Sequence, residues 1–538
     1  MRHNLSTHFN YDQKESTMHL FKKIAPILFA CSILLLTAAN KPKDDPNKIV
    51  VNVDLGKDSI SKFIYGHFAE HLGHGIYGGI YVGENSSIPN TRGIRNDVVE
   101  ALREIGPSVV RWPGGCFADT YHWKDGIGPK DQRPSIVNTN WGGVTEDNSF
   151  GTHEFLDFCD MIGAEPYICV NVGSGTVQEA SEWVEYINSD AKSPMTELRK
   201  KNGREKPWHV KFWAVGNESW GCGGNMTPDY YSDVYKRFAT YMRGWGLYRV
   251  ASGGTDPDFD WTETVLQKTQ KFRNLIQGYS FHYYTFCHGW NDKTSATKFN
   301  ENDWFYTMKN TLVMEERLER HIALMDEYDP QNRIGIMADE WGNWFTVEPG
   351  TNPGFLFQQN TLRDAVTAGL YLDIFNNHAR RVKMANIAQM VNVLQAMILT
   401  KDDQIVKTPT YYVFKMYKVH QSATLLPIHV TCEDYTYDGM TLPSVSASAS
   451  QDKEGRIHVS MTNIDPHNDR TVEIDLRGTD KLSSSAGEII TAPHENDYND
   501  FGKPENVNIQ KFSSFSIKNN ILKVDLPSKS VVTIELKK

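Results

Sequence analysis

The feature that most constrains the fold is a regular alternation of short apolar runs with amphipathic stretches between Phe63 and Leu394. Eight of the runs are typical of buried strands: Phe63–Phe68, Ser108–Trp112, Pro166–Val172, Val210–Val215, Arg249–Gly253, Ile276–His282, Ile334–Ala338 and Met384–Val393. Helical periodicity dominates the stretches between them. Eight strand–helix units in about 330 residues predict a (β/α)8 TIM barrel. A doubly wound sheet is the alternative, but no Gly-rich phosphate turn follows the first strand.

A second domain follows the barrel. With 538 residues, the chain is too long for one compact core. From about Leu425 the segments become short, alternating and separated by turns, as in Ile457–Asn463, which is typical of an antiparallel β-sandwich. We therefore expect a catalytic barrel over residues 61–423, a C-terminal β-sandwich over 424–538, and a strand within 40–60 that joins the sandwich.

The N-terminus has the pattern of a targeting segment. A pair of lysines precedes an apolar run, Ala25–Leu36, and small residues follow it. We expect residues 1–39 to be a signal region with its true start at Met18 and cleavage after Ala39, so that the protein is exported to the periplasm or secreted. A lipid anchor at Cys31 is an alternative. The run is too short for a membrane span, which takes about 20 residues.

Charge and cysteine spacing narrow the possible partners. The net charge of −10 argues against nucleic acid, because binding to phosphates needs a basic face. No metal-type spacing occurs among the six cysteines after the signal region, so we expect mostly buried free thiols, and the sequence leaves disulfides open. They are Cys116, Cys159, Cys169, Cys222, Cys287 and Cys432.

Polar and aromatic residues gather at the ends of the predicted strands. In a barrel these ends share one face, where active sites lie. The candidates there are Glu70, Cys116, Asn171, Asn217, Glu218, His282, Tyr284, Glu340 and Gln389. Three tryptophans near the same ends offer a surface for stacking a sugar or for core packing: Trp220, Trp341 and Trp344.

Two of these candidates, Glu218 and Glu340, follow the fourth and seventh strands and would face each other across the barrel mouth. Glycosidic bond cleavage requires such a pair, one acid and one carboxylate that attacks or activates water. We expect His282 and Tyr284 to hydrogen-bond Glu340 and keep it ionised. The alternatives are a capping or ion-paired Glu218, a salt bridge from Glu340 to Arg111, and a purely structural His282.

Several long motifs occur in a fixed order along the chain. They are Tyr65–Gly73, Arg111–Gly115, Trp123–Pro129, Asp147–Phe155, Gly216–Glu218, Gly221–Met226, Asp339–Trp341 and Ala388–Val393. Through these motifs the chain resembles glycoside hydrolase family 51, the α-L-arabinofuranosidases of clan A, over essentially all of the sequence after the signal region.

The resemblance implies a retaining double displacement with Glu218 as acid/base and Glu340 as nucleophile. It also implies a sugar pocket formed by Glu70, Asn217, His282, Tyr284 and Gln389, to which we add Cys116 and Trp344. Cys116 departs from the family, which often has Asn there, and Cys is a weaker donor and acceptor. No cofactor or metal is expected, and a hexamer is implied.

The predicted function is an exo-acting α-L-arabinofuranosidase that hydrolyses terminal non-reducing residues of arabinan, arabinoxylan or derived oligosaccharides. An endo-glucanase or xylanase on the same barrel is the first alternative, and a long open cleft would favour it. A non-catalytic carbohydrate-binding protein is another alternative. A metal-dependent hydrolase or zinc protein is the last, with Cys116, Cys222, Cys287 and His288 as ligands, although their spacing fits no standard site.

Overall fold

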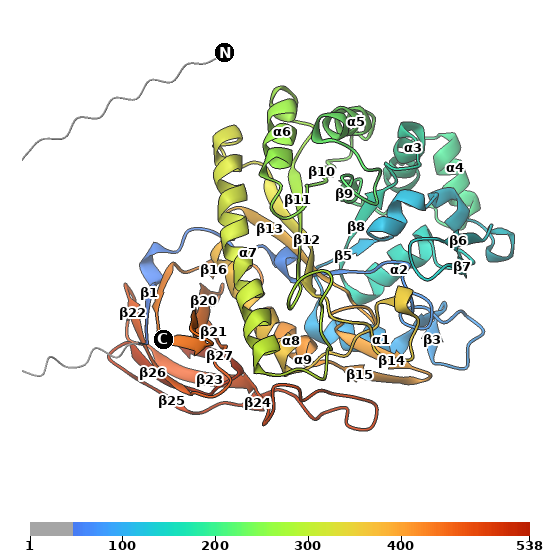
Figure 1. The fold of residues 1–538 in the computed structure, drawn as a ribbon. Coiled ribbons are helices and arrows are strands. Elements are labelled where there is room, and N and C mark those ends of the chain that lie inside the picture. The colour runs from blue at the N-terminus through green and yellow to red at the C-terminus, as the bar shows by residue number, and fades with distance from the viewer. Residues whose placement is uncertain (1–46) are drawn as a thin grey trace, which may run out of the picture. The chain divides into compact units, whose positions relative to one another are not determined.

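Eight parallel strands close into a barrel in the computed structural model, which describes residues 47–538 (Figure 1). The strands follow the order β10-β11-β12-β13-β2-β5-β8-β9 around the barrel. Their bounds are β2 (Gly66–Phe68), β5 (Val109–Trp112), β8 (Glu165–Val170), β9 (Phe212–Val215), β10 (Tyr248–Ala251), β11 (Gly278–Thr285), β12 (Gly335–Asn343) and β13 (Val382–Ala388). The predicted signal region, with Met18, Cys31 and Ala39, lies outside the described residues.

Continuous apolar runs form these strands because both faces of a barrel strand are covered. In β9 all four residues, Phe212–Val215, are buried. The α-helices of the surrounding layer and its insertions are α1 (Asn96–Ile105), α2 (Thr152–Ile162), α3 (Val177–Asn188), α4 (Pro194–Lys201), α5 (Pro228–Tyr241), α6 (Phe259–Thr269), α7 (Glu301–Tyr328), α8 (Leu362–Asn377) and α9 (Pro409–Tyr417). The predicted barrel is confirmed.

Two further sheets pack face to face and form the predicted β-sandwich. One has the order β17-β1-β22-β26-β25 and the other β16-β20-β21-β27-β23-β24. The strands are β1 (Lys48–Asn52), β16 (Thr424–Leu425), β17 (Ile428–Thr431), β20 (Val445–Gln451), β21 (Ile457–Asn463), β22 (Arg470–Arg477), β23 (Ser483–Ile490), β24 (Gln510–Lys511), β25 (Phe515–Lys518), β26 (Ile521–Leu526) and β27 (Ser530–Lys537). Because β1 lies between β17 and β22, residues from both ends of the chain build this sandwich.

Helix α8 joins the barrel to the sandwich. It contacts β20 and β21, and almost all of its residues are buried. Asp373 of α8 accepts hydrogen bonds from Ser448 (2.8 Å) and Tyr417 (3.1 Å), and Asn376 donates one to Ser448 (3.2 Å). Barrel and sandwich therefore belong to one unit, residues 45–538.

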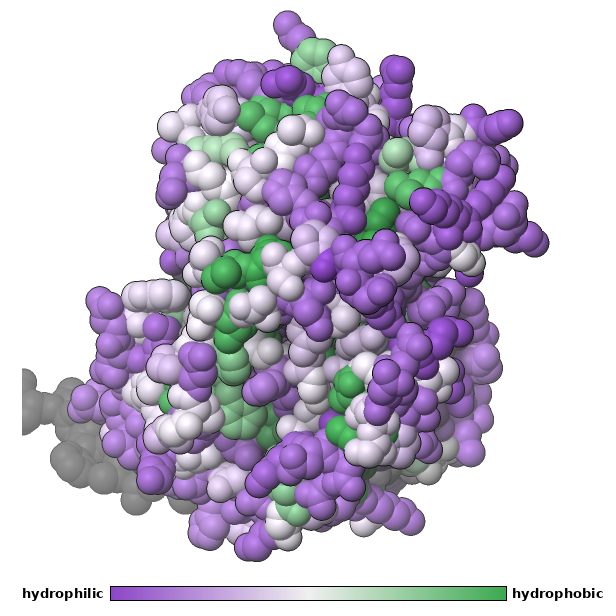
Figure 2. All heavy atoms as spheres, turned by 90° about the vertical axis from the view of Figure 1, so that its right-hand side faces the viewer, coloured by the Kyte–Doolittle hydropathy of each residue, from purple (hydrophilic) through white to green (hydrophobic). Residues whose placement is uncertain are grey.

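Four two-stranded hairpins complete the described structure. They are β3 (Asn90–Thr91) with β4 (Ile94–Arg95), β6 (Ile136–Asn138) with β7 (Val144–Glu146), β14 (Ile398–Lys401) with β15 (Gln404–Lys407), and β18 (Asp434–Tyr437) with β19 (Met440–Pro443). The face that Figure 2 shows is mostly hydrophilic, with hydrophobic side chains in small groups. Among residues 47–538, no helix has both the length and the apolar character needed to cross a membrane.

Candidate active site

A cavity of about 490 Å³ opens at the carboxyl ends of the barrel strands. All nine side chains expected in the site line it: Glu70, Cys116, Asn217, Glu218, His282, Tyr284, Glu340, Trp344 and Gln389. Trp220 lines it too, whereas Trp341 is fully buried and packs against Phe414 in the core. Asn171 is not in the lining; its amide holds the loop that follows β8, through Ser174 and Gly175.

The two candidate carboxylates lie close together. Glu218 comes three residues after the end of β9, on a turn where its own φ is 38°, which is uncommon for a residue other than glycine. Glu340 lies on β12. One carboxylate oxygen of each, together with a ring nitrogen of His282, lie within 4.8 Å of one another. The side chain of Glu218 is 21% exposed and that of Glu340 is 8% exposed.

Glu340 is held by two strong hydrogen-bond donors. Arg111, from β5, places Nη1 2.6 Å from Oε1, and the Tyr284 hydroxyl donates to Oε2 at 2.7 Å. The expected contact from Tyr284 is thus present, and so is the salt bridge to Arg111 that stood as the alternative. The two donors contact different oxygens and so fix the orientation of the Glu340 carboxyl group.

His282 differs from its expected role. Its Nδ1 hydrogen-bonds Glu218 Oε1 at 2.9 Å and lies 3.6 Å from Glu340 Oε1, so its short contact is with the other carboxylate. Nε2 faces Asp339 at 3.4 Å. Burial alone lowers the pKa of His282, but the surrounding carboxylates of Glu340, Asp339 and Glu218 reverse this and raise the pKa to about 10. The ring is therefore a cation at neutral pH.

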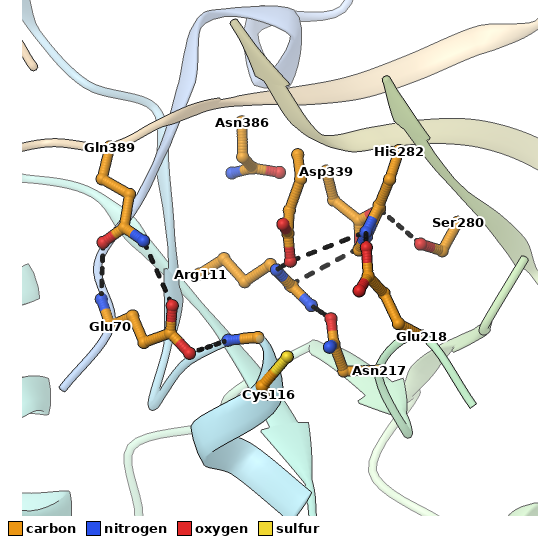
Figure 3. Close-up of polar contacts among 12 residues, drawn as sticks. Glu70, Arg111, Cys116, Asn217, Glu218, Ser280, His282, Asp339, Asn386 and Gln389 are labelled. Atoms are coloured by element: carbon orange, nitrogen blue, oxygen red, sulfur yellow. Dashed lines mark hydrogen bonds and ion pairs between the residues drawn. The ribbon is translucent and has the colours of Figure 1, made fainter. Parts of the chain in front are cut away.

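Asp339 and Arg111 are both buried and lie next to each other, with Arg111 Nε 3.6 Å from Asp339 Oδ2 (Figure 3). Asp339 accepts hydrogen bonds from Ser280 (2.6 Å) and Tyr167 (2.7 Å). Burial raises the pKa of Asp339, but His282 and Arg111 outweigh it and lower the pKa to about 2. Asp339 lies in the motif Asp339–Trp341 but was not among the residues predicted for the site.

The second branch of Arg111 positions Asn217. Nη2 donates to Asn217 Oδ1 at 2.6 Å, which leaves the Asn217 amide hydrogens for other partners. The guanidinium also lies over the ring of Phe68, 4.6 Å from its centroid. One arginine therefore orients both the carboxylate of Glu340 and the amide next to Glu218.

Glu70 forms a second polar group on the other side of the cavity (Figure 3). Its Oε1 accepts from the backbone nitrogens of Gly115 (3.0 Å) and Phe117 (3.1 Å) and from Trp141 Nε1 (2.9 Å). Gln389 donates to Oε2 at 3.2 Å and accepts from the Glu70 backbone at 3.2 Å. Burial and the charge of Glu340 raise the pKa of Glu70 to about 7. Trp141 carried no motif signal and was missed.

A disulfide joins Cys116 and Cys222 and so links the loop after β5 to the turn that carries Glu218. Cys116 lines the cavity but has no S–H group to donate to a sugar. The alternative metal site, with Cys116, Cys222, Cys287 and His288 as ligands, is wrong because Cys116 and Cys222 form this disulfide. The other two ligands lie in a separate cluster, where His288 Nε2 is 2.9 Å from Asp303 Oδ1 and Cys287 Sγ is 3.3 Å from the Asp303 carbonyl oxygen.

The remaining cysteines follow the expectation of free thiols. Cys159, Cys169 and Cys287 are buried and free, and Cys432 is free and partly exposed.

The fold and the site together define a class. A (β/α)8 barrel whose mouth brings two carboxylates within 4.8 Å of each other, next to amide and aromatic side chains, is the arrangement of a glycoside hydrolase.

Comparisons with known proteins give the family. Residues 101–301 match the "Alpha-L-arabinofuranosidase 1 domain", and residues 339–530 match the "Alpha-L-arabinofuranosidase C-terminal domain". The intracellular exo-α-L-arabinofuranosidase of Bacteroides ovatus is 54% identical over 91% of this chain and 95% of its own. The chain belongs to the α-L-arabinofuranosidases of glycoside hydrolase family 51.

Solved structures agree with this assignment. The family 51 arabinofuranosidase of Xanthomonas axonopodis pv. citri superposes with a TM-score of 0.89 at 46% identity, over 91% of this chain and 99% of that one. The α-L-arabinofuranosidase of Thermotoga maritima, in an arabinose complex, gives a TM-score of 0.79 at 33% identity over the same shares.

One expectation is contradicted by these relatives. The Bacteroides ovatus protein is named an intracellular enzyme, whereas the lysine pair and apolar run near the N-terminus predicted export. The predicted export is therefore contradicted by this comparison.

Proposed function

We propose that this enzyme removes terminal non-reducing α-L-arabinofuranosyl residues from arabinan, arabinoxylan or derived oligosaccharides, with retention of configuration. The observation that carries the proposal is the short separation of Glu218 and Glu340, whose nearest oxygens lie within 4.8 Å. Retaining enzymes hold their carboxyl groups about 5–5.5 Å apart, and inverting enzymes about 6.5–9.5 Å apart to admit a water.

The environments of the two glutamates suggest their roles. Arg111 and Tyr284 bind both oxygens of Glu340 and fix its carboxyl group in place, as a positioned nucleophile requires. Glu218 is more exposed and reaches toward the rim, where a leaving group departs and water enters. His282 bridges the pair and can stabilise negative charge on Glu218 after it has given up its proton.

The reaction then proceeds in two displacements. A Glu340 oxygen attacks C1 of the arabinofuranose and the bond from C1 to the glycosidic oxygen breaks, while Glu218 protonates that oxygen. Water next attacks C1 of the glycosyl-enzyme, Glu218 takes the proton from the water, and Glu340 leaves as carboxylate. Two inversions at C1 give net retention.

An enclosed polar end supports exo action. Glu70 and Gln389 are each 2% exposed, so the side of the cavity that they line is enclosed and suits a terminal sugar with its hydroxyl groups. An endo-glucanase or xylanase would need an open cleft on both sides of the cleaved bond. The Bacteroides ovatus relative, named an exo-acting enzyme, supports the same conclusion.

Kinetics on an aryl α-L-arabinofuranoside test the proposal. Glu340→Ala should abolish turnover, and azide should restore it with a glycosyl azide of opposite configuration. Glu218→Ala should slow substrates with poor leaving groups far more than activated ones. Glu316→Ala is the control, since Glu316 is 59% exposed on α7 and does not line the cavity.

Proton NMR of the first-formed sugar provides the decisive stereochemical result. The α-anomer of arabinofuranose should appear first. An initial β-anomer, or near-normal rates of both active-site variants on natural oligosaccharides, would show the proposal to be wrong.

The hexamer implied by the family resemblance is part of the proposal. Light scattering on the purified protein should then give about six times the 61.2 kDa chain mass. A monomer or dimer would contradict it and would leave the catalytic roles unaffected.

A further inference from the structure

Trp290 has an unusual place at the rim of the active-site cavity. Its side chain is 60% exposed, and among residues 47–538 it is the one exposed large hydrophobic residue that also lines the cavity. Trp245, 46% exposed, lies elsewhere on the surface. Large exposed aromatic side chains at a binding site commonly mark a contact surface.

Aromatic contacts connect Trp290 with the nucleophile. The rings of Trp290 and Trp344 lie 5.3 Å apart, centroid to centroid, and those of Trp344 and Tyr284 lie 5.1 Å apart. Tyr284 in turn donates its hydroxyl to Glu340. A continuous series of rings therefore leads from the reacting carboxylate to the outer edge of the cavity.

The loop that carries Trp290, between β11 and α7, is fixed at both ends. Asn310 Nδ2 donates to the carbonyl oxygens of Phe286 and Cys287, each at 2.8 Å. Farther along, the Thr346 backbone nitrogen donates to the Thr294 carbonyl oxygen at 2.8 Å. These bonds anchor the loop on both sides of Trp290.

Lys293 supports the indole from one side. Its ammonium lies 3.9 Å from the centroid of the Trp290 ring and donates to the Trp290 carbonyl oxygen at 2.7 Å. Trp290 lines the cavity and Lys293 does not. The indole remains 60% exposed beside this lysine, so part of its surface is open to a ligand.

The position of this exposed indole surface indicates which part of the substrate it contacts. The polar end of the cavity, with Glu70 and Gln389, is buried and suits the sugar that is removed. Glu218 is the more exposed of the two glutamates, and in the proposed mechanism it protonates the leaving oxygen on the open side of the cavity, which Trp290 also lines. A group attached to that oxygen therefore extends toward Trp290.

We propose that Trp290 determines specificity for the leaving group, because the sugar ring attached to the departing arabinofuranose packs its C–H face on the indole. This inference rests on the proposed function and adds the residue that contacts the carbohydrate leaving group. Binding energy from such a remote contact raises kcat/KM only for substrates that carry the ring.

Two substrates distinguish a contact with the leaving group from a general effect of Trp290 on the active site. Methyl α-L-arabinofuranoside has no ring in its leaving group, whereas the leaving group of α-(1→5)-linked arabinotriose is a disaccharide, whose first ring would contact the indole. Trp290→Ala should lower kcat/KM on arabinotriose by about tenfold or more, mainly through a higher KM. Tenfold corresponds to about 1.4 kcal/mol. The variant should leave the methyl glycoside within about twofold. Trp290→Phe should restore most of the loss, and Trp245→Ala should alter neither substrate.

Each other result overturns the inference. Equal losses of kcat/KM on both substrates would mean that Trp290 only shapes the loop. An unchanged kcat/KM on arabinotriose would mean that the indole does not contact the leaving group. A wild-type enzyme inactive on both substrates would overturn the proposed function itself. Calorimetric titration of arabinotriose into Glu340→Gln gives a second measurement, in which adding Trp290→Ala should weaken binding by a similar factor.

Discussion

Arg111 and Glu340 form a buried ion pair, with Nη1 2.6 Å from Oε1 and both side chains less than a tenth exposed. A buried pair of this kind is weak evidence for stability, since desolvation of both charges opposes their attraction. Its importance here is geometric and electrostatic. The same guanidinium binds Asn217, so one side chain sets the charge and the position of the groups around the proposed reaction centre.

Removal of Arg111 should therefore affect both stability and activity. Arg111→Ala leaves the Glu340 charge buried without its partner and should lower the free energy of unfolding by about 3–5 kcal/mol. Arg111→Lys keeps the charge but cannot bind Asn217 and Glu340 with two branches, so it should lose activity with a smaller loss of stability. Urea unfolding and kcat/KM measure the two effects. Arg320→Ala, at a 54% exposed side chain, is the control, and an active and stable Arg111→Ala would contradict the assignment.

His282 should make stability depend on pH in the alkaline range. Its pKa in the folded protein is raised from 6.5 to about 10, so its cation stabilises the fold fully below about pH 6.5. That contribution is lost as the pH rises through 10. The difference in Tm between wild type and His282→Gln should thus be largest near pH 6 and shrink toward pH 10. A difference that stays constant or grows over this range would show that His282 is neutral in the folded protein.

Replacement of Glu70 by glutamine should raise stability relative to wild type at neutral pH and lower activity. Its pKa is raised from 4.5 to about 7, so the protonated form is favoured by folding, and stability is lost as the pH rises from about 4.5 through 7. Glu70→Gln stays neutral, and its Tm relative to wild type should increase over that interval. Activity should fall by about 10- to 100-fold, because an amide N–H would then face the donating Nε2 of Gln389. A fully active Glu70→Gln would contradict this role.

The sequence predicted the barrel well because each of its strands is a continuous apolar run between amphipathic helices. Glu218 and Glu340 were predicted from their places after apolar runs, and both line the cavity, although β12 continues past Glu340 to Asn343. Their catalytic roles remain predictions. The contacts among site residues were harder to predict. His282 was expected at Glu340 but hydrogen-bonds Glu218, since the register of β11 and β12 does not fix which way an imidazole turns.

Other features had weak or ambiguous signals. Helix α4 was overlooked because it is short and polar, although Ser193 before Pro194 is a start signal. Trp341 belongs to the core, which its sequence position next to Glu340 could not show. The pairing of Cys116 with Cys222 spans 106 residues, and spacing alone cannot give connectivity.

The disulfide gives the last prediction, because it cross-links the turn that carries the proposed acid/base. Within that turn, the Glu218 carbonyl oxygen accepts from the Gly221 backbone nitrogen at 2.7 Å, and Cys222 Sγ lies 3.8 Å from Glu218 Oε2. Cys222 is exposed, so a dithiol reductant can reach it. Loss of the link should let the turn move and misplace the Glu218 carboxyl group, and small displacements of catalytic groups are costly.

Dithiothreitol should therefore lower kcat about tenfold on substrates with poor leaving groups and much less on activated aryl substrates, which need little protonation. Reoxidation should restore the rate. Cys116→Ser combined with Cys222→Ser should reproduce the loss and make the enzyme insensitive to the reductant, with about 2–4 kcal/mol less stability. Cys432→Ser, at a free and partly exposed thiol, should behave as wild type. If the double variant kept normal kcat on every substrate, the disulfide would have no part in positioning Glu218.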